Sequence, residues 1–359
     1  MTEIFERLFR PVLFALDAER AHRMSVIGLK SGLVAQPAFS DPALQVEIAG
    51  LKFPNPVGIA AGYDKNAEAL TGLGQLGFGF VEAGTVTPRP QPGNPKPRIF
   101  RLKQDYAVIN RLGFNNHGHD RVNARVSKRA SGAIVGVNIG ANKDSENFVS
   151  DYVAGVRRFL HVADYLTVNI SSPNTPGLRN LQARDALELL LKEVLNAREE
   201  LQTNGSASKP IFLKIAPDLD QRELDDVAET ILASGVDGVI VSNTTLNRDN
   251  LKSRNRTETG GLSGAPLFDL STRVLARMRI RLRPDFPIIG VGGVDGPDTA
   301  WQKISAGANL VQLYTGLVYK GPKLPNLINQ GLSQKLKVEG LKSITELSGR
   351  DVKSWAAEE

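Results

Sequence analysis

Short apolar runs alternate with amphipathic stretches along the chain from residue 57 onward. The amphipathic stretches place apolar residues three and four positions apart, as a helix requires; the clearest are 183–202 and 221–235, where Gly235 provides a C-terminal stop. The apolar runs are rich in β-branched residues and end in small or polar ones: 57–62, 80–85, 134–140, 165–171, 211–216, 238–243, 287–293 and 310–316. Such strands, alternating with helices, predict a parallel sheet covered on both faces.

Eight strand–helix units over about 260 residues fit an α/β fold of the (β/α)8 TIM-barrel type. A doubly wound open sheet is the structural alternative, but eight regular units would be many for it. Residues 1–40 lie outside the repeat and have an amphipathic helical pattern, which Pro11 is expected to kink or break. The chain therefore divides into a helical segment, 1–40, and a barrel domain, 41–359.

A second segment outside the repeat is the proline-rich stretch 87–98, TPRPQPGNPKPR, which should be extended and stiff. The runs IFRL and AVIN after it indicate a hairpin inserted behind the second strand, and a helix is expected after residue 118. The motif GLGQLG at 72–77 lies between a helical pattern and a strand, which is the reverse of the order in a dinucleotide site, so it predicts a helix-to-strand connection. DLD at 218–220 is expected to cap a helix.

Polar residues gather where the predicted strands end, and in a TIM barrel the active site lies at these carboxyl ends. The stretch NISSPNTPG, 169–177, is the most polar of them. Lys214 is flanked by Phe212, Leu213 and Ile215, so its charge either faces a ligand anion or is buried without a partner, which is costly. Asparagines after three strands suit a heterocycle with alternating donors and acceptors, because an amide pairs with both.

Composition narrows the chemistry further. The chain of 359 residues has 44 Lys+Arg and 38 Asp+Glu, so its net charge of +6 permits anionic small molecules or a membrane surface without singling out nucleic acid. It has no cysteine, which excludes disulfides, thiolate catalysis and Cys-ligated metal sites. The pair His117 and His119 lacks a third ligand at helical spacing, so no metal site is predicted. The run VLFAL, 12–16, is too short for a signal core or a membrane span.

Several motifs together resemble the dihydroorotate dehydrogenase family over roughly residues 45–325: AAGYDKN, GTVTPRPQPGNPKPRIFRL, INRLGFNNHG, VNISSPNTPGLRNLQ, SNTT, GGLSGAPL, GVGGV and QLYTGLVYKGP. Within the family, the helical extension and the absence of cysteine resemble the membrane-associated class, which reduces quinone and uses a serine base. Tyr63 stands at a position that is often leucine in the family, and Ser242 at one that is threonine in some relatives.

The resemblance implies a role for each matching residue. Ser172 is the implied catalytic base. Dihydroorotate is expected to contact Lys65, Asn110, Arg111, Leu112, Gly113, Phe114, Asn169, Asn174, Asn243 and Thr244. FMN is expected to contact Ala61, Gly62, Tyr63, Asp64, Lys65, Thr85, Asn138, Asn169, Lys214 and Ser242, with its phosphate at Gly264, Gly293, Tyr314 and Thr315. A quinone site is expected at His22, Arg101 and Tyr314.

The implied activity is oxidation of dihydroorotate to orotate, with FMN passing the electrons to a membrane quinone, in pyrimidine biosynthesis. The expected protein is a monomer that lies on the cytoplasmic side of the cell membrane without crossing it and binds no nucleic acid. Two rival functions remain at the level of sequence: another FMN-dependent barrel enzyme resembling the dihydrouridine synthases, which would imply a catalytic cysteine, and a ligand-binding barrel without catalysis.

Overall fold

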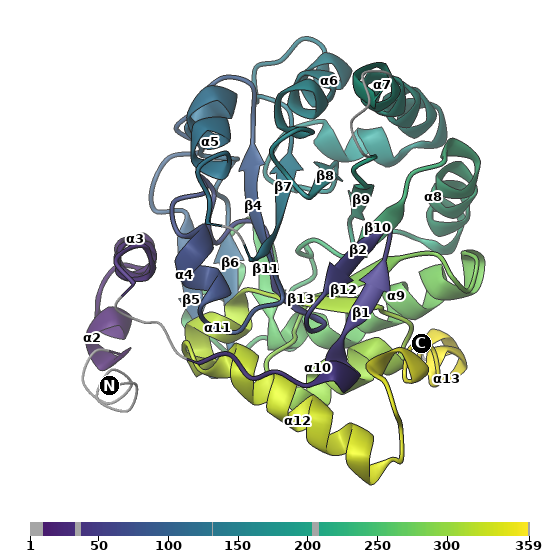
Figure 1. Cartoon of the computed structure of the whole chain (residues 1–359). Helices are drawn as coiled ribbons and strands as arrows, with labels where there is room; N and C mark the ends of the chain where they lie inside the picture. The colour runs from purple at the N-terminus through teal and green to yellow at the C-terminus, as the bar shows by residue number, and fades with distance from the viewer. Residues whose placement is uncertain (1–9, 33–36, 131, 203–207, 358–359) are drawn as a thin grey trace.

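The computed structural model describes residues 10–32, 37–130, 132–202 and 208–357, and its centre is a closed barrel of eight parallel strands (Figure 1). Neighbours around the barrel follow the order of the chain, so the TIM-barrel prediction is confirmed and the open sheet is excluded. Each strand falls in one of the eight apolar runs, except that β4 extends one residue beyond the run 80–85: β3 Val57–Ile59, β4 Phe80–Val86, β7 Ile134–Ile139, β8 Tyr165–Asn169, β9 Ile211–Ile215, β10 Gly238–Val241, β12 Ile288–Val291 and β13 Leu310–Leu313.

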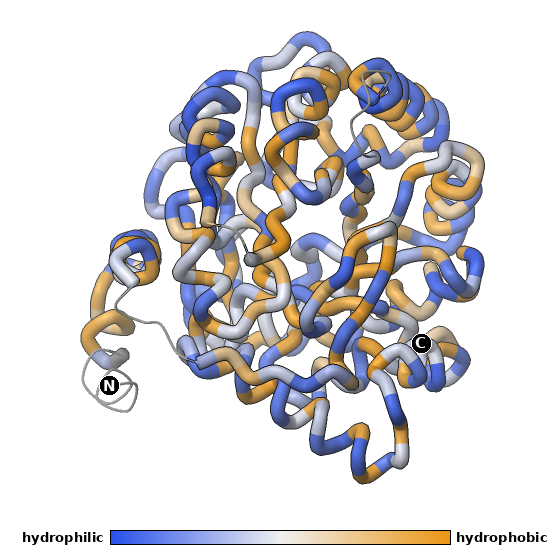
Figure 2. Tube along the Cα trace, in the orientation of Figure 1, coloured by the Kyte–Doolittle hydropathy of each residue, from blue (hydrophilic) through white to orange (hydrophobic). Residues whose placement is uncertain are grey.

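Helices surround the barrel, with hydrophilic residues alternating with hydrophobic ones along them (Figure 2). They are α4 Leu70–Gly74, α5 Gly118–Val126, α6 Phe148–Phe159, α7 Arg184–Gln202, α8 Gln221–Ser234, α9 Phe268–Arg281, α10 Pro297–Ser305, α11 Thr315–Lys320, α12 Leu324–Val338 and α13 Val352–Ala357. Asp220 caps α8 in a capping box with Glu223, and Gly235 ends it with φ of 81°. Both helix boundaries were predictable from the sequence. GLGQLG is the predicted connection from α4 to β4.

Three further groups of elements decorate the barrel. At the N-terminus, α3 Ala18–Lys30 packs against α4 and β5, and α2 Arg10–Ala15 packs against α3 (Figure 1). A hairpin of β1 Val46–Ile48 and β2 Leu51–Phe53 precedes the barrel. The predicted hairpin, β5 Ile99–Leu102 and β6 Ala107–Asn110, gains a third strand, β11 Gly261–Gly264. Short 3₁₀ turns cover 42–44, 103–105, 178–182, 254–257, 265–267 and 344–346. Residues 1–9 and 33–36 of the predicted N-terminal segment lie outside the described residues.

Aromatic rings and glycines interlock at the amino end of the barrel. Neighbouring strands pair Gly58 with Phe80, Gly136 with Tyr165, and Gly238 with Phe212. In each pair, a Cβ on the glycine would overlap the ring of its partner. The rings of Phe80, Tyr165 and Phe212 form a chain with centroid separations of 6.4 and 5.5 Å. The absent side chains thus make the space that the rings fill.

A buried carboxylate lies directly above this aromatic floor. Glu82 of β4 is fully buried, and its two oxygens accept hydrogen bonds from Asn138 Nδ2 at 2.8 Å, Tyr165 Oη at 3.0 Å and Gln312 Nε2 at 2.8 Å. These donors come from three other strands of the barrel. Because a buried charge is costly unless it is hydrogen-bonded, the three donors are what make Glu82 tolerable in the barrel interior.

We predict that Gly136→Ala destabilises the protein by about 1–3 kcal/mol, since the new methyl group would force the Tyr165 ring out of a close-packed layer. Thermal or urea unfolding measures the change. Gly296→Ala is the matched control: its φ of −173° suits any residue and its Cβ would meet open space, so it should stay within about 1 kcal/mol of the wild type. Equal effects from the two substitutions would contradict the interlock.

Candidate active site

One cavity of about 400 Å³ runs from the N-terminal helices to the carboxyl ends of the barrel strands. Its outer part is lined by α2 and α3, and its inner part by the loops that follow β3, β8, β10, β12 and β13. Most residues predicted for the site lie on its wall: Ala61, Gly62, Tyr63, Lys65, Thr85, Asn110, Leu112, Gly113, Phe114, Asn169, Ser172, Asn174, Lys214, Ser242, Asn243, Thr244, Gly264, Gly293, Tyr314, Thr315, His22 and Arg101.

Three predicted residues lie behind the wall instead. Asp64 accepts hydrogen bonds from the backbone N–H groups of Glu68 and Ala69, at 2.8 and 2.7 Å, and so orders the loop after β3. Asn138 is fully buried between Glu82 and Thr85. The guanidinium of Arg111 lies 4.5 Å from the centroid of the Phe100 ring and pairs with Glu258. Each of the three therefore contacts neighbouring residues and does not line the cavity itself.

Amides and hydroxyls form a connected cluster at the inner end of the cavity. Asn169 Nδ2 donates to Thr85 Oγ1 at 2.9 Å, and Asn169 Oδ1 accepts from Ser171 Oγ at 2.9 Å and from Asn243 Nδ2 at 3.3 Å. Thr85 Oγ1 donates in turn to Asn138 Oδ1 at 2.6 Å. The cluster is thereby tied to Glu82 in the barrel interior, which fixes the orientation of each amide.

Ser172 stands next to this cluster and is 6% exposed. Its Oγ accepts the backbone N–H of Asn174 at 3.2 Å, and among the described residues no acceptor is found for its own O–H. A hydrogen bond donated to Oγ favours negative charge on that oxygen. No histidine or carboxylate of the described residues forms a hydrogen bond with Ser172. The N–H of Asn174 is therefore the protein group found to stabilise charge on its Oγ.

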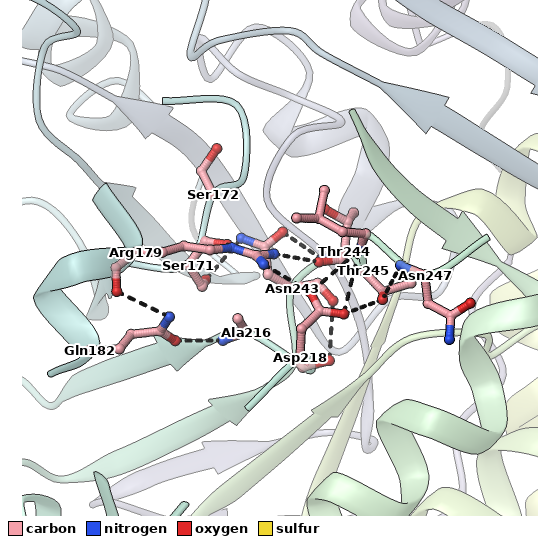
Figure 3. A network of polar contacts seen from close by, with 12 residues as sticks. Ser171, Ser172, Arg179, Gln182, Ala216, Asp218, Asn243, Thr244, Thr245 and Asn247 are labelled. Atoms are coloured by element: carbon pink, nitrogen blue, oxygen red, sulfur yellow. Dashed lines mark hydrogen bonds and ion pairs between the residues drawn. The ribbon is translucent and has the colours of Figure 1, made fainter. Parts of the chain in front are cut away.

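The Ser172 side chain points away from a network of polar contacts centred on Arg179 (Figure 3). Arg179 connects the loops that carry the cluster. Its guanidinium donates to the carbonyls of Ser171 and Thr244, at 3.1 and 3.0 Å, and pairs with Asp218 at 2.9 Å. Asp218 also accepts a hydrogen bond from Thr245 Oγ1. One arginine thus joins the loops after β8, β9 and β10, and fixes their relative positions around the cavity.

Lys214 is 5% exposed on β9, and no hydrogen bond from its Nζ to another described residue is found. Burial lowers its pKa, and the charge of Glu82 opposes that shift. The side chain lines the cavity, so an electron-rich or anionic group bound there would supply the missing partner. This is the arrangement that the apolar flanks of Lys214 predict.

Lys65 is a second cation at the cavity. Its Nζ donates to the carbonyl of Gly62 at 2.7 Å, and burial lowers its pKa to about 8, with the charge of Glu19 acting in the opposite direction. An anion beside Lys65 would raise this pKa again, so the residue is suited to hold a carboxylate as its cationic form.

Glycine backbone forms the wall near β11 and β12. Gly264, Gly292 and Gly293 have φ of 101°, 118° and 72°, a region that favours glycine. A Cβ on Gly293 would come within 2.5 Å of Phe268, and one on Gly264 within 2.9 Å of Thr315. Backbone at glycine turns beside a cavity can offer N–H groups to an anion such as phosphate.

Aromatic side chains line the passage toward α3. The His22 and Tyr63 rings meet edge to face with centroids 5.1 Å apart, and Tyr63 meets Tyr314 in the same way at 5.3 Å. The Tyr63 hydroxyl donates to Ser25 Oγ at 2.9 Å. Burial lowers the pKa of His22 to about 3, so this ring is neutral at physiological pH. Arg101 donates to the carbonyls of Leu13, at 2.9 Å, and Leu16, and so caps the end of α2.

Sequence reasoning missed several residues that shape the site. Glu82 lies inside an apolar run, and nothing in that run indicates the three donors that converge on it. Ser25 and Arg179 act through contacts with residues 38 and 65 positions away. The only available signal was chemical: a carboxylate in the middle of a buried strand needs partners.

The comparisons with known proteins agree with one another. A sequence model of the family described as dihydroorotate dehydrogenase matches residues 43–336. A protein of Brucella anthropi named dihydroorotate dehydrogenase (quinone) is 63% identical over 100% of this chain and 99% of its own length, and one of Brucella ovis with the same name is 62% identical over 99% of both. The ligand-free dihydroorotate dehydrogenase of Eimeria tenella superposes with a TM-score of 0.88 at 42% identity, covering 93% of this chain and 99% of that one.

We predict that Lys214→Met weakens the binding of FMN, an anionic ligand with an electron-rich ring, by about tenfold or more, because it removes a buried cation of the wall that has no hydrogen-bond partner among the described residues. The flavin retained after purification and a fluorescence titration with FMN measure the loss. Lys192→Met, on the exposed face of α7, is the control and should retain flavin like the wild type. Similar retention by both variants would show that Lys214 has no part in binding.

Proposed function

The chain belongs to the dihydroorotate dehydrogenase family, and on that premise we propose that it oxidises dihydroorotate to orotate with a quinone as electron acceptor, in pyrimidine biosynthesis. The single observation that carries the proposal is the continuous cavity, which has an amide-rich inner end and an aromatic outer end. Membership of this family sets aside both rivals, a dihydrouridine synthase-like enzyme and a barrel without catalysis. It also implies a flavin cofactor, which we take to be FMN.

The residues of the cavity fit FMN. The buried Lys214 without a hydrogen-bond partner suits the electron-rich edge of a flavin ring, and the glycine wall at Gly264 and Gly293 suits its phosphate. Thr85, Asn169 and Ser242 add hydrogen-bonding groups between these two ends. When bound, FMN supplies the acceptor for the hydride from C6 of dihydroorotate and passes both electrons on to quinone.

The protein's own groups handle the substrate and its proton. Ser172 Oγ takes the proton from C5 while its own hydroxyl proton passes to solvent, and the N–H that Asn174 donates to Oγ stabilises the negative charge that makes this oxygen basic. Asn169, Asn243 and Asn174 offer amides to the pyrimidine ring, and Lys65 offers a cation to the substrate carboxylate. The Asn169 amide donates to Thr85 and accepts from Ser171, so it is held in place before the substrate arrives and little ordering remains for the reaction itself.

The outer end of the cavity suits an apolar acceptor. Its wall is built from α2 and α3 together with Tyr63 and Tyr314, and His22 is neutral there. We propose that quinone reaches the flavin through this passage. The hydroxyl of Tyr314, 3.4 Å from His22 Nδ1, is the polar group best placed to meet the quinone carbonyl.

Membrane association follows from the quinone, and the helices indicate how it is achieved. No described helix is long and apolar enough to cross a bilayer. Val26 and Leu29 of α3 are buried in the main hydrophobic cluster, while Val12, Met24 and Ile27 are 55%, 51% and 53% exposed. A helix pair with an exposed apolar face beside basic residues is suited to lie in the membrane interface. We propose that residues 1–40 serve this role on the cytoplasmic side, and that the protein is a monomer.

We expect Ser172→Ala to keep its flavin but to reduce it about 10²–10⁴ times more slowly with dihydroorotate, since a general base typically contributes that factor. Anaerobic rapid mixing, followed by the bleaching of the flavin, measures the rate. Ser127→Ala, at the exposed end of α5, should behave like the wild type. Reduction of the Ser172 variant at the wild-type rate would remove this residue from the base role.

We further expect that Val12→Glu combined with Ile27→Glu releases the protein from anionic liposomes, with the partition coefficient falling about tenfold or more, because two apolar side chains leave the interface and two negative charges enter it. Co-sedimentation measures the partition, and reduction of the flavin by dihydroorotate should not change. Leu189→Glu replaces an equally exposed apolar residue on α7 and should leave binding intact. Liposome binding that survives the double substitution would contradict the proposed membrane face.

A further inference from the structure

Lys303 of α10 is fully buried behind the glycine wall, and nothing in the proposed mechanism uses it. Its Nζ donates to Ser271 Oγ at 2.7 Å and to the carbonyl of Phe268 at 3.4 Å, and it lies 4.7 Å from the centroid of the Phe268 ring. No carboxylate of the described residues forms an ion pair with it; the exposed Asp269 acts only from a distance. Burial lowers the pKa of Lys303 well below its usual value. An anion bound nearby would favour the charged form of Lys303.

The hydrogen bonds of Lys303 lead directly to the cavity wall. Ser271 Oγ, which accepts from Lys303, lies 3.2 Å from the carbonyl oxygen of Gly292 and 3.1 Å from that of Phe268. Gly292 and Gly293 line the cavity, and a Cβ on either would collide with Ser271 or Phe268. The backbone of Gly292 and Gly293 therefore packs against the first turn of α9, and Lys303 donates hydrogen bonds to the same turn.

The orientation of one peptide group follows from this support. In a trans peptide, the C=O and the following N–H point in opposite directions. Because the Gly292 carbonyl is directed toward Ser271, the N–H of Gly293 is directed the other way, toward the cavity. Among the described residues no acceptor is found for this N–H. The same contacts that satisfy Lys303 thus leave a donor facing the site.

We propose that Lys303 is a positioning residue for the phosphate group of the flavin: through Ser271 and the Phe268 carbonyl, it fixes the glycine wall so that backbone N–H groups face the phosphate, and its charge favours the anion. The inference rests on the proposed function, because it assumes that FMN is the ligand. It predicts selectivity for a phosphorylated flavin over the same flavin without phosphate, which a purely structural lysine would not affect.

The test is a competition between FMN and riboflavin. Purified holoprotein is equilibrated with mixtures of the two flavins, freed of unbound flavin, and analysed for the flavin that it retains. Lys303→Met, which keeps the length of the side chain and removes its charge, should lower the preference for FMN about tenfold or more. Lys335→Met removes a surface cation of α12 that pairs with Asp298 of α10, the helix that carries Lys303. This variant should leave the preference unchanged.

Ser271→Ala provides a second variant in case the first does not fold: it removes one hydroxyl, keeps the lysine, and should lower the preference in the same direction. An unchanged ratio of FMN to riboflavin in either soluble variant would overturn the inference, even if both flavins bound more weakly, because equal weakening is what a structural role produces. A wild-type protein that retained neither flavin would overturn the proposed function as well, so the two failures are distinguishable.

Discussion

The buried carboxylate of Glu82 is the interaction on which the site depends. It lies between the aromatic floor of the barrel and the polar layer above, and its donors come from β7, β8 and β13. Asn138 is oriented by the hydrogen bond that it donates to Glu82. Its oxygen accepts from Thr85, and Thr85 in turn accepts from Asn169. The charge of Glu82 also raises the pKa of Lys214, against the lowering that burial causes. A carboxylate at this depth is costly by itself, so the network is stable only when every donor is present.

The cavity combines two environments that one barrel end would not provide alone. Its inner part consists of strand ends braced by Arg179, and its outer part of helices held against the barrel by ion pairs. Arg98 is buried and pairs with Glu19 of α3 at 2.7 Å, while Arg23 of α3 pairs with Glu68. These contacts fix the helices relative to the strand ends, so the amide-rich inner end and the aromatic outer end of the cavity keep their relative positions.

The sequence predicted elements whose signal is local and missed those that depend on distant partners. Eight apolar runs became the eight barrel strands, and Asp220 caps a helix where expected, because both signals lie within a few residues. The strand β11 escaped notice since GLSG has no apolar run and exists only by pairing with β6, about 150 residues earlier. For the site, most predicted residues reach the wall, but Asp64, Asn138 and Arg111 turn to neighbours that no motif reveals.

The glycine–aromatic pairs in the barrel floor carry a consequence for how this sequence can evolve. Gly58 faces Phe80, Gly136 faces Tyr165, and Gly238 faces Phe212, each across one pair of neighbouring strands. A larger residue at the glycine is accommodated only if the ring opposite becomes smaller, and a smaller ring alone leaves a void. Neither single step conserves the packed volume. The two positions of each pair are therefore expected to covary among homologues, and to be inherited as a unit.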